Sequence, residues 1–236
     1  MRTLMMATLA ALVLCAGAAG DYIPLPVKWS QLPYDLNTET LPISDCVIWD
    51  PGPVWADDFL CDSPEPIVAV RWWGTYPQDN TVRPTGYVPA HISFHLSAGP
   101  HPDSLPVDVP VEFYEVSAQQ EWTGEMVTAW GAPVYRYDAY LPTWFDQFLY
   151  SRQSPNVGEL FIDICVPDAI DMWCWMPLAP GGPILDWSAA SWGHNGPWSR
   201  DEYLDLAFEL MTIPEPATMS LLGLGLLGLV ARRRRK

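Results

Sequence analysis

The sequence has few basic residues outside its two ends. Of its twelve lysines and arginines, Arg2 and the five at 232–236 lie in the terminal segments. The part of the chain between these segments therefore has six basic residues and 27 of the 28 acidic ones. Six minus 27 gives the remainder a net charge of about −21. Such a surface repels nucleic acid and anionic headgroups, which excludes a nucleic-acid partner and suits a secreted protein.

Motifs of enzymes and metal sites are also missing. No Cys-x-x-Cys supports a zinc ribbon, and no Gly-x-Ser-x-Gly elbow accompanies the Ser93, His95 and Asp103 from which a triad could be drawn. No spacing selects the two carboxylates that glycoside hydrolysis needs. His91 and His95 share a strand face and could hold a metal, but we favour ordinary solvated histidines.

Short alternating segments, and no convincing helical period outside the two ends, predict an all-β domain. In 90–98, apolar residues alternate with polar ones, as in a half-buried strand. Turns rich in proline and glycine separate such segments, so we expect a β-sandwich of the jelly-roll type over 45–213, preceded by an extended, loop-like segment at 21–44. The expected strands are Ile67–Trp73, Ala90–Ala98, Val109–Val116, Glu125–Trp130, Val134–Leu141, Glu159–Val166 and Tyr203–Met211.

The two ends carry export features. Residues 1–20 have a basic start, an apolar run and a small-residue exit, as in a signal peptide for signal peptidase. Residues 217–231 carry no charge and span about 22 Å as a helix, a short transmembrane segment. The basic cluster at 232–236 places the positive end in the cytoplasm and the domain outside.

The tail combines Pro214, Glu215 and Pro216, the apolar segment and a basic cluster with Arg232, Arg233, Arg234 and Arg235. Together, at 214–236, these features resemble the PEP-CTERM sorting signal. The resemblance implies that an exosortase-type transpeptidase processes an exported protein of an exopolysaccharide-producing bacterium. The protein would be held in the membrane by its C-terminal helix and then reach the cell surface or the extracellular space.

Several segments between the two ends have a further resemblance. They are Trp55–Cys61, Arg71–Tyr76, Ile92–His95 and Asp205–Leu210. These segments resemble an uncharacterised exported domain that precedes PEP-CTERM tails in planctomycete-type bacteria. That domain has no activity to carry over, so the resemblance implies fold and location only.

Four cysteines remain once the signal peptide is set aside. An even count in an exported chain predicts disulfides, and sequence alone leaves three pairings open. We favour local pairing of Cys46 with Cys61 and of Cys165 with Cys174, because each bond would join neighbouring strands.

Asp57 and Asp58 are the sharpest acidic pair. In a loop bounded by proline and glycine they could hold calcium, the one cofactor that we consider. Their spacing is not that of an Asp-x-Asp-x-Asp loop, so we favour a solvated acidic turn where a strand begins.

All thirteen tryptophans lie between the two ends. We assign most of them to core packing, with Trp72 and Trp73 on opposite faces of one strand, and keep sugar stacking as the alternative. The loop at 193–198 is our candidate for an exposed ligand edge, with His194, Trp198 and the preceding Trp192 as its residues. We therefore expect a structural surface protein without catalysis. A carbohydrate-binding module for exopolysaccharide is the alternative, and a polysaccharide-degrading enzyme the second alternative.

Overall fold

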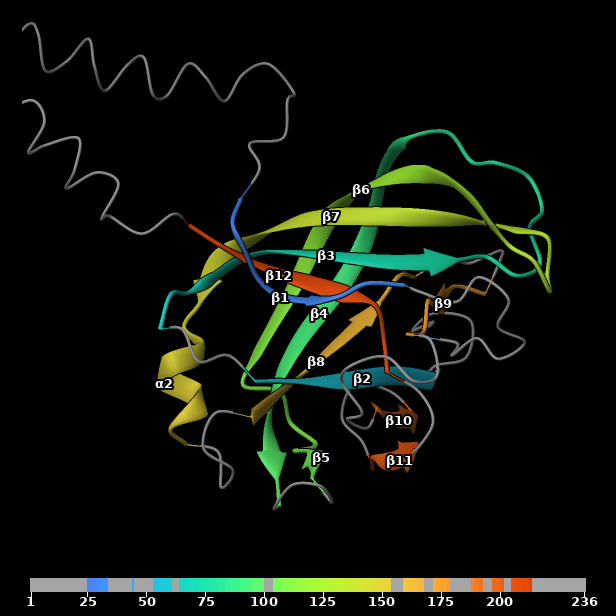
Figure 1. Cartoon of the computed structure of the whole chain (residues 1–236). Coiled ribbons are helices and arrows are strands. Elements are labelled where there is room, and N and C mark those ends of the chain that lie inside the picture. Colours follow the sequence, from blue (N-terminus) through green and yellow to red (C-terminus); the bar gives the residue numbers. More distant parts are fainter. Residues whose placement is uncertain are drawn as a thin grey trace, which may run out of the picture.

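The computed structural model describes residues 25–33, 44, 53–60, 64–99, 104–153, 159–167, 172–178, 188–192, 197–201 and 205–213. Within these residues the five-residue helix α2, Gln147–Ser151, interrupts an otherwise all-β chain (Figure 1), as the sequence predicts. The strands are β1 Val27–Gln31, β2 Pro53–Leu60, β3 Ile67–Thr75, β4 Gly86–Ala98, β5 Leu105–Pro106, β6 Glu112–Val127, β7 Ala132–Phe145, β8 Glu159–Cys165, β9 Cys174–Trp175, β10 Ser188–Trp192, β11 Ser199–Asp201 and β12 Phe208–Thr212.

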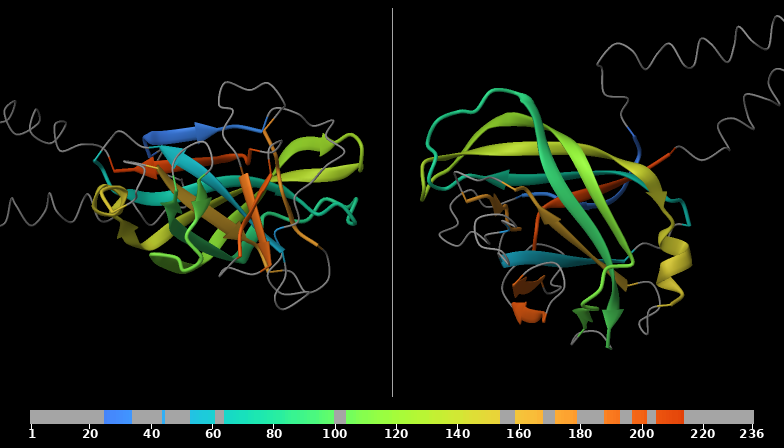
Figure 2. Two further views of the ribbon diagram at one scale, coloured as in Figure 1. Left: turned by 90° about the horizontal axis from the view of Figure 1, so that it is seen from below. Right: turned by 180° about the vertical axis from the view of Figure 1, so that it is seen from behind.

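The strands form one antiparallel sheet in the order β1-β12-β3-β7-β6-β4-β8-β2-β10-β11. Strand β5 adds to β4, and β9 adds to β3. The long hairpin of β6 and β7 is the middle of this order, and views from below and from behind show how strongly the sheet curls (Figure 2). Curling brings strands that are distant in the order to face each other, as in a sandwich.

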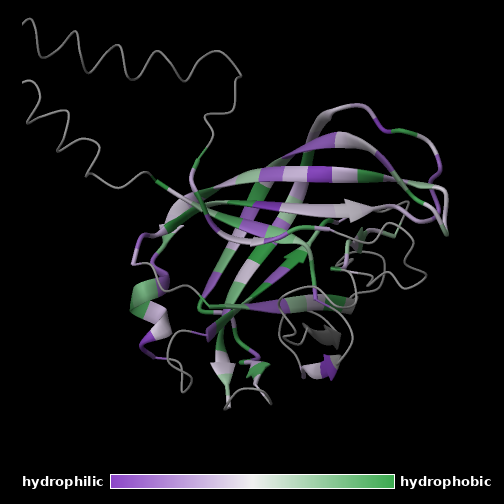
Figure 3. Ribbon diagram, viewed as in Figure 1, coloured by the Kyte–Doolittle hydropathy of each residue, from purple (hydrophilic) through white to green (hydrophobic). Residues whose placement is uncertain are grey.

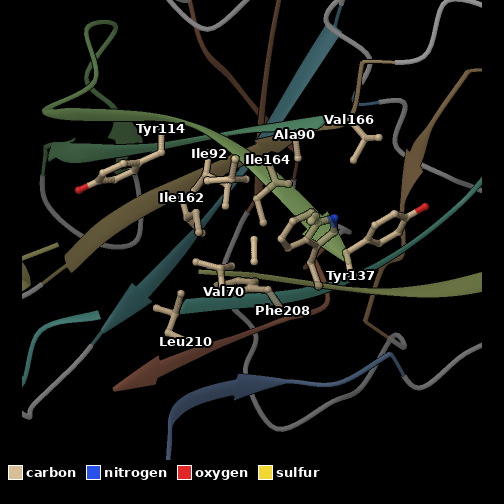
Figure 4. Close-up of a cluster of buried hydrophobic side chains, with 14 of the residues drawn as sticks. Val70, Ala90, Ile92, Tyr114, Tyr137, Ile162, Ile164, Val166, Phe208 and Leu210 are labelled. Atoms are coloured by element: carbon tan, nitrogen blue, oxygen red, sulfur yellow. The ribbon is translucent and has the colours of Figure 1, made fainter. Parts of the chain in front are cut away.

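Apolar side chains of the two halves meet in the core that the curled sheet encloses. Phe59 of β2 contacts Phe208 of β12 edge to face, with ring centroids 6.4 Å apart, although five strands lie between β2 and β12 in the sheet order. Figure 4 shows Ile92 and Ile164 on one side of this core and Phe208 and Leu210 on the other. Burial of these side chains is the main term that stabilises the curled sheet.

A buried carboxylate links strand β2 to the segment just ahead of strand β12. Asp57 Oδ2 of β2 accepts a hydrogen bond from Leu206 N, just ahead of β12, at 2.7 Å. With its amide nitrogen facing these groups, Gln31 of β1 donates to Asp57 Oδ2 at 3.2 Å and to Leu206 O at 3.1 Å. A buried carboxylate is stable only where donors surround it, so Asp57 is a structural link.

The structure corrects several local predictions. Strand β2 occupies the predicted acidic turn, so the solvated turn at Asp57 and Asp58 was wrong: both side chains are buried. Strand β1 lies inside the segment predicted to be loop-like and pairs with β12. The single strand β6 replaces two predicted strands, because it runs through the expected turn between them.

The apolar tail at 217–231 and the signal segment lie outside the described residues. Among the residues that the structure does describe, no helix has the length and apolar character needed to cross a membrane.

Candidate functional site

Polar side chains form a row across the outer face of the sheet. The strand register places Arg71 of β3 between Glu209 of β12 and Asp138 of β7. The row continues to Ser30 of β1 on one side and to Gln119 of β6 on the other. Because side chains alternate between the faces of a strand, these residues point away from the core. Figure 3 shows the polar bands of β7, β3 and β12 lying side by side.

A continuous chain of hydrogen bonds and ion pairs joins six side chains from five strands: Ser30, Glu209, Arg71, Asp138, Arg136 and Glu121. Arg71 donates from Nε to Asp138 Oδ1 at 2.6 Å and from Nη1 to Glu209 Oε2 at 3.1 Å. Arg136 donates from Nε to the other oxygen of Asp138 at 2.9 Å. We call these six residues the charged row.

The environment of Arg71 fixes its charge. Burial alone would lower the pKa of Arg71, but the hydrogen bond and the charge of Asp138, together with Glu209, raise that pKa above its ordinary value. The guanidinium of Arg71 therefore stays protonated. The charged row holds two guanidinium groups and three carboxylates, so its own net charge is −1.

Four residues of the charged row line an open groove of about 360 Å³: Arg71, Glu121, Arg136 and Glu209. Two tryptophans are among the residues that line the groove: Trp73 of β3, which is buried, and Trp122 of β6, which is 41% exposed. The groove is lined by Leu32, Arg71, Trp73, Glu121, Trp122, Thr123, Arg136 and Glu209.

A bulge in β6 sets the position of Trp122. The register between β6 and β7 shifts between Trp122 and Met126, and Gly124 within that interval has φ of +89°, a value that side chains disfavour. The indole Nε1 of Trp122 donates to Glu125 O at 3.2 Å. This bond holds the ring in place although much of it is exposed.

A second polar cluster lies buried on β4 and β8. His95 Nε2 is 2.8 Å from Asp163 Oδ2, and His95 Nδ1 is 2.8 Å from Val107 O. The prediction that His95 is a solvated histidine was therefore wrong, since its side chain is fully buried. A carbonyl oxygen only accepts, so Nδ1 carries a proton, and neither ring nitrogen is open to take one from Ser93. These residues are not a nucleophile and its base.

The structure does not bring the predicted calcium ligands together. Asp57 and Asp58 are neighbours on a strand and therefore point to opposite faces, and Asp57 already binds backbone and side-chain donors. Within the described part of the chain, no group of three or more His, Cys, Asp or Glu residues is arranged to hold a metal ion.

The structure does not place Trp198 at an exposed edge, where a ligand was predicted to bind. Trp198 is 8% exposed and packs with Val54, Ala56 and Phe161, while its ring meets His95 edge to face at 5.4 Å. The prediction of an exposed Trp198 was wrong, because the outer face of β2 and β8 is apolar here and Trp198 covers it. His194 and the side chain of Trp192 lie outside the described residues.

The predicted local disulfide between Cys165 and Cys174 was wrong. The two side chains are buried and are not joined to each other by a disulfide. The remaining two candidates, Cys46 and Cys61, lie outside the described residues, as do the sorting-signal residues 214–216 and 232–235.

Sequence reasoning missed the charged row, although a signal for it was present. Arg71 and Arg136 interrupt runs of apolar and aromatic residues at positions where a strand interior is otherwise hydrophobic. A charge inside such a strand requires partners on neighbouring strands. Which strands are neighbours is not readable from the sequence, so the partners Asp138 and Glu209 could not be assigned.

The described residues form a curled all-β sheet with a polar groove on its outer face. The family model described as a domain of unknown function (DUF7901) matches residues 27–211, and the chain belongs to that family. The PEP-CTERM protein-sorting motif matches residues 212–235, which confirms the motif predicted at the tail and implies export and processing by an exosortase. No curated protein and no solved structure matches the chain.

Proposed function

We propose that the domain is a non-catalytic surface module that binds uncharged extracellular glycan in the outer groove. The observation that carries the proposal is that planar, hydrogen-bonded groups of the charged row and the half-exposed Trp122 line the same groove. Sugar rings offer hydroxyl groups at their edges and apolar C–H faces. Such a ligand fits a groove that offers both kinds of contact.

Charge selects the class of glycan. The charged row has a net charge of −1, and the whole chain carries −16. Both values oppose a polymer of uronic acids or sulfated sugars. The arginines are already neutralised by carboxylates, so they donate hydrogen bonds to hydroxyl oxygens without adding an excess positive charge.

The absence of catalysis is also part of the proposal. General acid–base chemistry needs a group that is open to exchange a proton with the ligand. Glu121 and Glu209 of the groove and the neighbouring Asp138 all accept hydrogen bonds from arginines, so their oxygens already have partners. Incubation with the polymer of the producing bacterium is expected to release no new reducing ends, and their release would overturn this part.

Binding is tested by affinity electrophoresis of the exported protein in gels that contain hydroxyethylcellulose, a neutral polymer, or polygalacturonate, an acidic one. We expect retardation in the neutral gel only. Trp122→Ala should weaken that retardation at least tenfold, the usual scale for a central aromatic contact. Trp130→Ala is the matched control, because Trp130 is a similarly exposed tryptophan on the same hairpin outside the groove. Equal retardation of both variants would overturn the groove assignment.

The proposal needs no cofactor, and calcium is tested in the same gels. If EDTA abolishes retardation and calcium restores it, calcium takes part in binding and the cofactor-free proposal is wrong. Unchanged retardation in EDTA is the expected result.

For the ends of the chain we propose a cleaved signal peptide at 1–20 and a membrane helix at 217–231 that holds the protein until the exosortase acts. Replacing Pro214, Glu215 and Pro216 by alanine should leave the whole tail on membrane-bound protein. The same processed C-terminus in this variant, found by peptide mapping, would contradict the proposal.

A further inference from the structure

The chain leaves the sheet toward its sorting tail at the end where α2 lies. Thr212 of β12 is paired with Ile67 of β3, and Ile67 is paired with Phe145 of β7. Helix α2 begins two residues after Phe145. The two strand spacings between β12 and β7 amount to about 10 Å, so the exit at Ile213 and α2 share one end of the sheet. Figure 1 shows β12 and α2 at this end.

Helix α2 leaves two of its apolar side chains exposed to solvent. The helix buries the polar Gln147, whereas Phe148 is 44% exposed and Leu149 is 54% exposed. Just before it, Trp144 at the end of β7 is 61% exposed. A helix that covers a core normally turns its apolar residues inward and its polar ones to water.

Local contacts fix the start of the helix and the ring of Phe148. The carboxylate of Asp146 accepts from Leu149 N at 3.1 Å and caps the helix. The guanidinium of Arg152 lies 3.9 Å from the ring centroid of Phe148. Tyr150 of the same helix packs against the core, whereas Trp144, Phe148 and Leu149 stay exposed; these three side chains form what we call the end patch.

The length of the tail identifies what faces the end patch. Three residues, 214–216, lie between Ile213 and the start of the uncharged segment at 217, so the four Cα–Cα steps reach about 14 Å at full extension. While that segment is in the bilayer, the end of the sheet stays close to the membrane surface. Tryptophan and phenylalanine are side chains that favour the membrane–water interface.

We propose that the end patch contacts the membrane while the sorting tail is still attached. This inference rests on the proposed membrane insertion of 217–231, and not on glycan binding. Three side chains are too small an apolar surface to hold a protein on a bilayer by themselves. The contact therefore orients the tethered domain and is lost once the tail is cut.

The test is hydroxyl-radical footprinting of the full chain in vesicles of phosphatidylethanolamine with a minor share of phosphatidylglycerol. The comparison is the full chain carrying Leu221→Lys and Leu226→Lys, whose tail cannot insert because each central lysine opposes insertion strongly. We expect oxidation of Trp144 and Phe148 to be at least fivefold slower in the inserted chain. Trp130, at the other end of β7 and 48% exposed, is the internal control and should be oxidised equally in both.

Equal oxidation of Trp144 in the two chains, with the wild type sedimenting with the vesicles, would overturn the inference. Protection of Trp144 in the lysine variant as protein concentration rises would also overturn it, because a second copy would then cover the patch. Failure of the wild type to sediment with vesicles would refute both the proposed anchoring and the membrane contact. Failure of glycan binding would leave the protection of Trp144 unchanged, so the two proposals are separated.

Discussion

Replacing Arg71 by methionine tests whether the charged row holds the outer face of the sheet together. Arg71 is the cation between Asp138 and Glu209, whose side chains are 2% and 10% exposed. Methionine retains an unbranched apolar stem, so the packing of the stem is kept while the charge and its donors are removed. Removing one partner of a fully buried ion pair costs about 3–5 kcal/mol, because the other charge is left without compensation.

The expected cost here is lower. The side chain of Arg71 is 22% exposed, Asp138 keeps its bond from Arg136, and Glu209 keeps its bond from Ser30 at 3.0 Å. We therefore expect the free energy of unfolding to fall by about 2 kcal/mol. For a domain of this size that corresponds to a drop in Tm of about 4–8 °C. Urea unfolding followed by tryptophan fluorescence measures the free energy, and a thermal melt measures the Tm.

The double variant Arg71→Met with Glu209→Gln is the control. Neutralising Glu209 removes one of the stranded charges, so the double variant should be about 1 kcal/mol more stable than the sum of the two single losses predicts. A single variant within about 0.5 kcal/mol of the wild type would show that the charged row carries little stability. Strict additivity of the two changes would refute the coupling through Arg71.

Three further predictions concern the core and the closure of the sheet. In Gly74→Ala the new Cβ would lie 2.4 Å from the indole of Trp173, so we expect a loss of about 3 kcal/mol in urea unfolding, while Gly86→Ala, with its nearest contact at 3.9 Å, should be nearly neutral. Asp57→Asn weakens the bonds that join β2 to the segment ahead of β12 and should cost about 2 kcal/mol in the same assay, and no measurable loss would contradict its role as a link. Burial raises the pKa of Tyr137 well above its ordinary value, so the stabilisation from its neutral form is complete below pH of about 10 and is lost at more alkaline pH. Absorbance at 295 nm should show this tyrosine ionising only as the protein unfolds. Ionisation of Tyr137 while the fold persists would refute the assignment.

Local patterns predicted the fold class because the period of two is a local property. The alternation in 90–98 gave a strand whose Ile92 and Phe94 lie in the core, as expected. Trp72 and Trp73 lie on opposite faces of β3, since Trp72 stacks on Tyr137 in the main core and Trp73 packs in a separate cluster on the outer face. Strand β6 was split in the prediction because its exposed polar residues resemble a turn when the neighbouring strands are unknown.

The site depended on long-range pairing, which the sequence does not display. The charge of Asp57, taken alone, predicts that its side chain is solvated. Its burial is possible because Gln31 and Leu206, both remote in sequence, donate hydrogen bonds to it. The same limit applies to the tryptophans: Trp198 covers an apolar outer face and is buried there, whereas Trp122, next to the bulge at Gly124, is 41% exposed. Residue type predicted an aromatic contact, but the strand order decides which ring reaches solvent.

Strand β7 connects the two proposed surfaces and sets the distance between them. Arg136 lines the groove, and Trp144 of the end patch lies eight residues further along the same strand. At about 3.3 Å per residue, this interval places the groove roughly 26 Å from the patch. A patch in contact with the membrane would therefore hold the groove clear of the lipid headgroups, on a face that is not turned toward the bilayer. Glycan binding would then not have to wait for cleavage of the tail, since the tethered domain already presents its groove to the extracellular side.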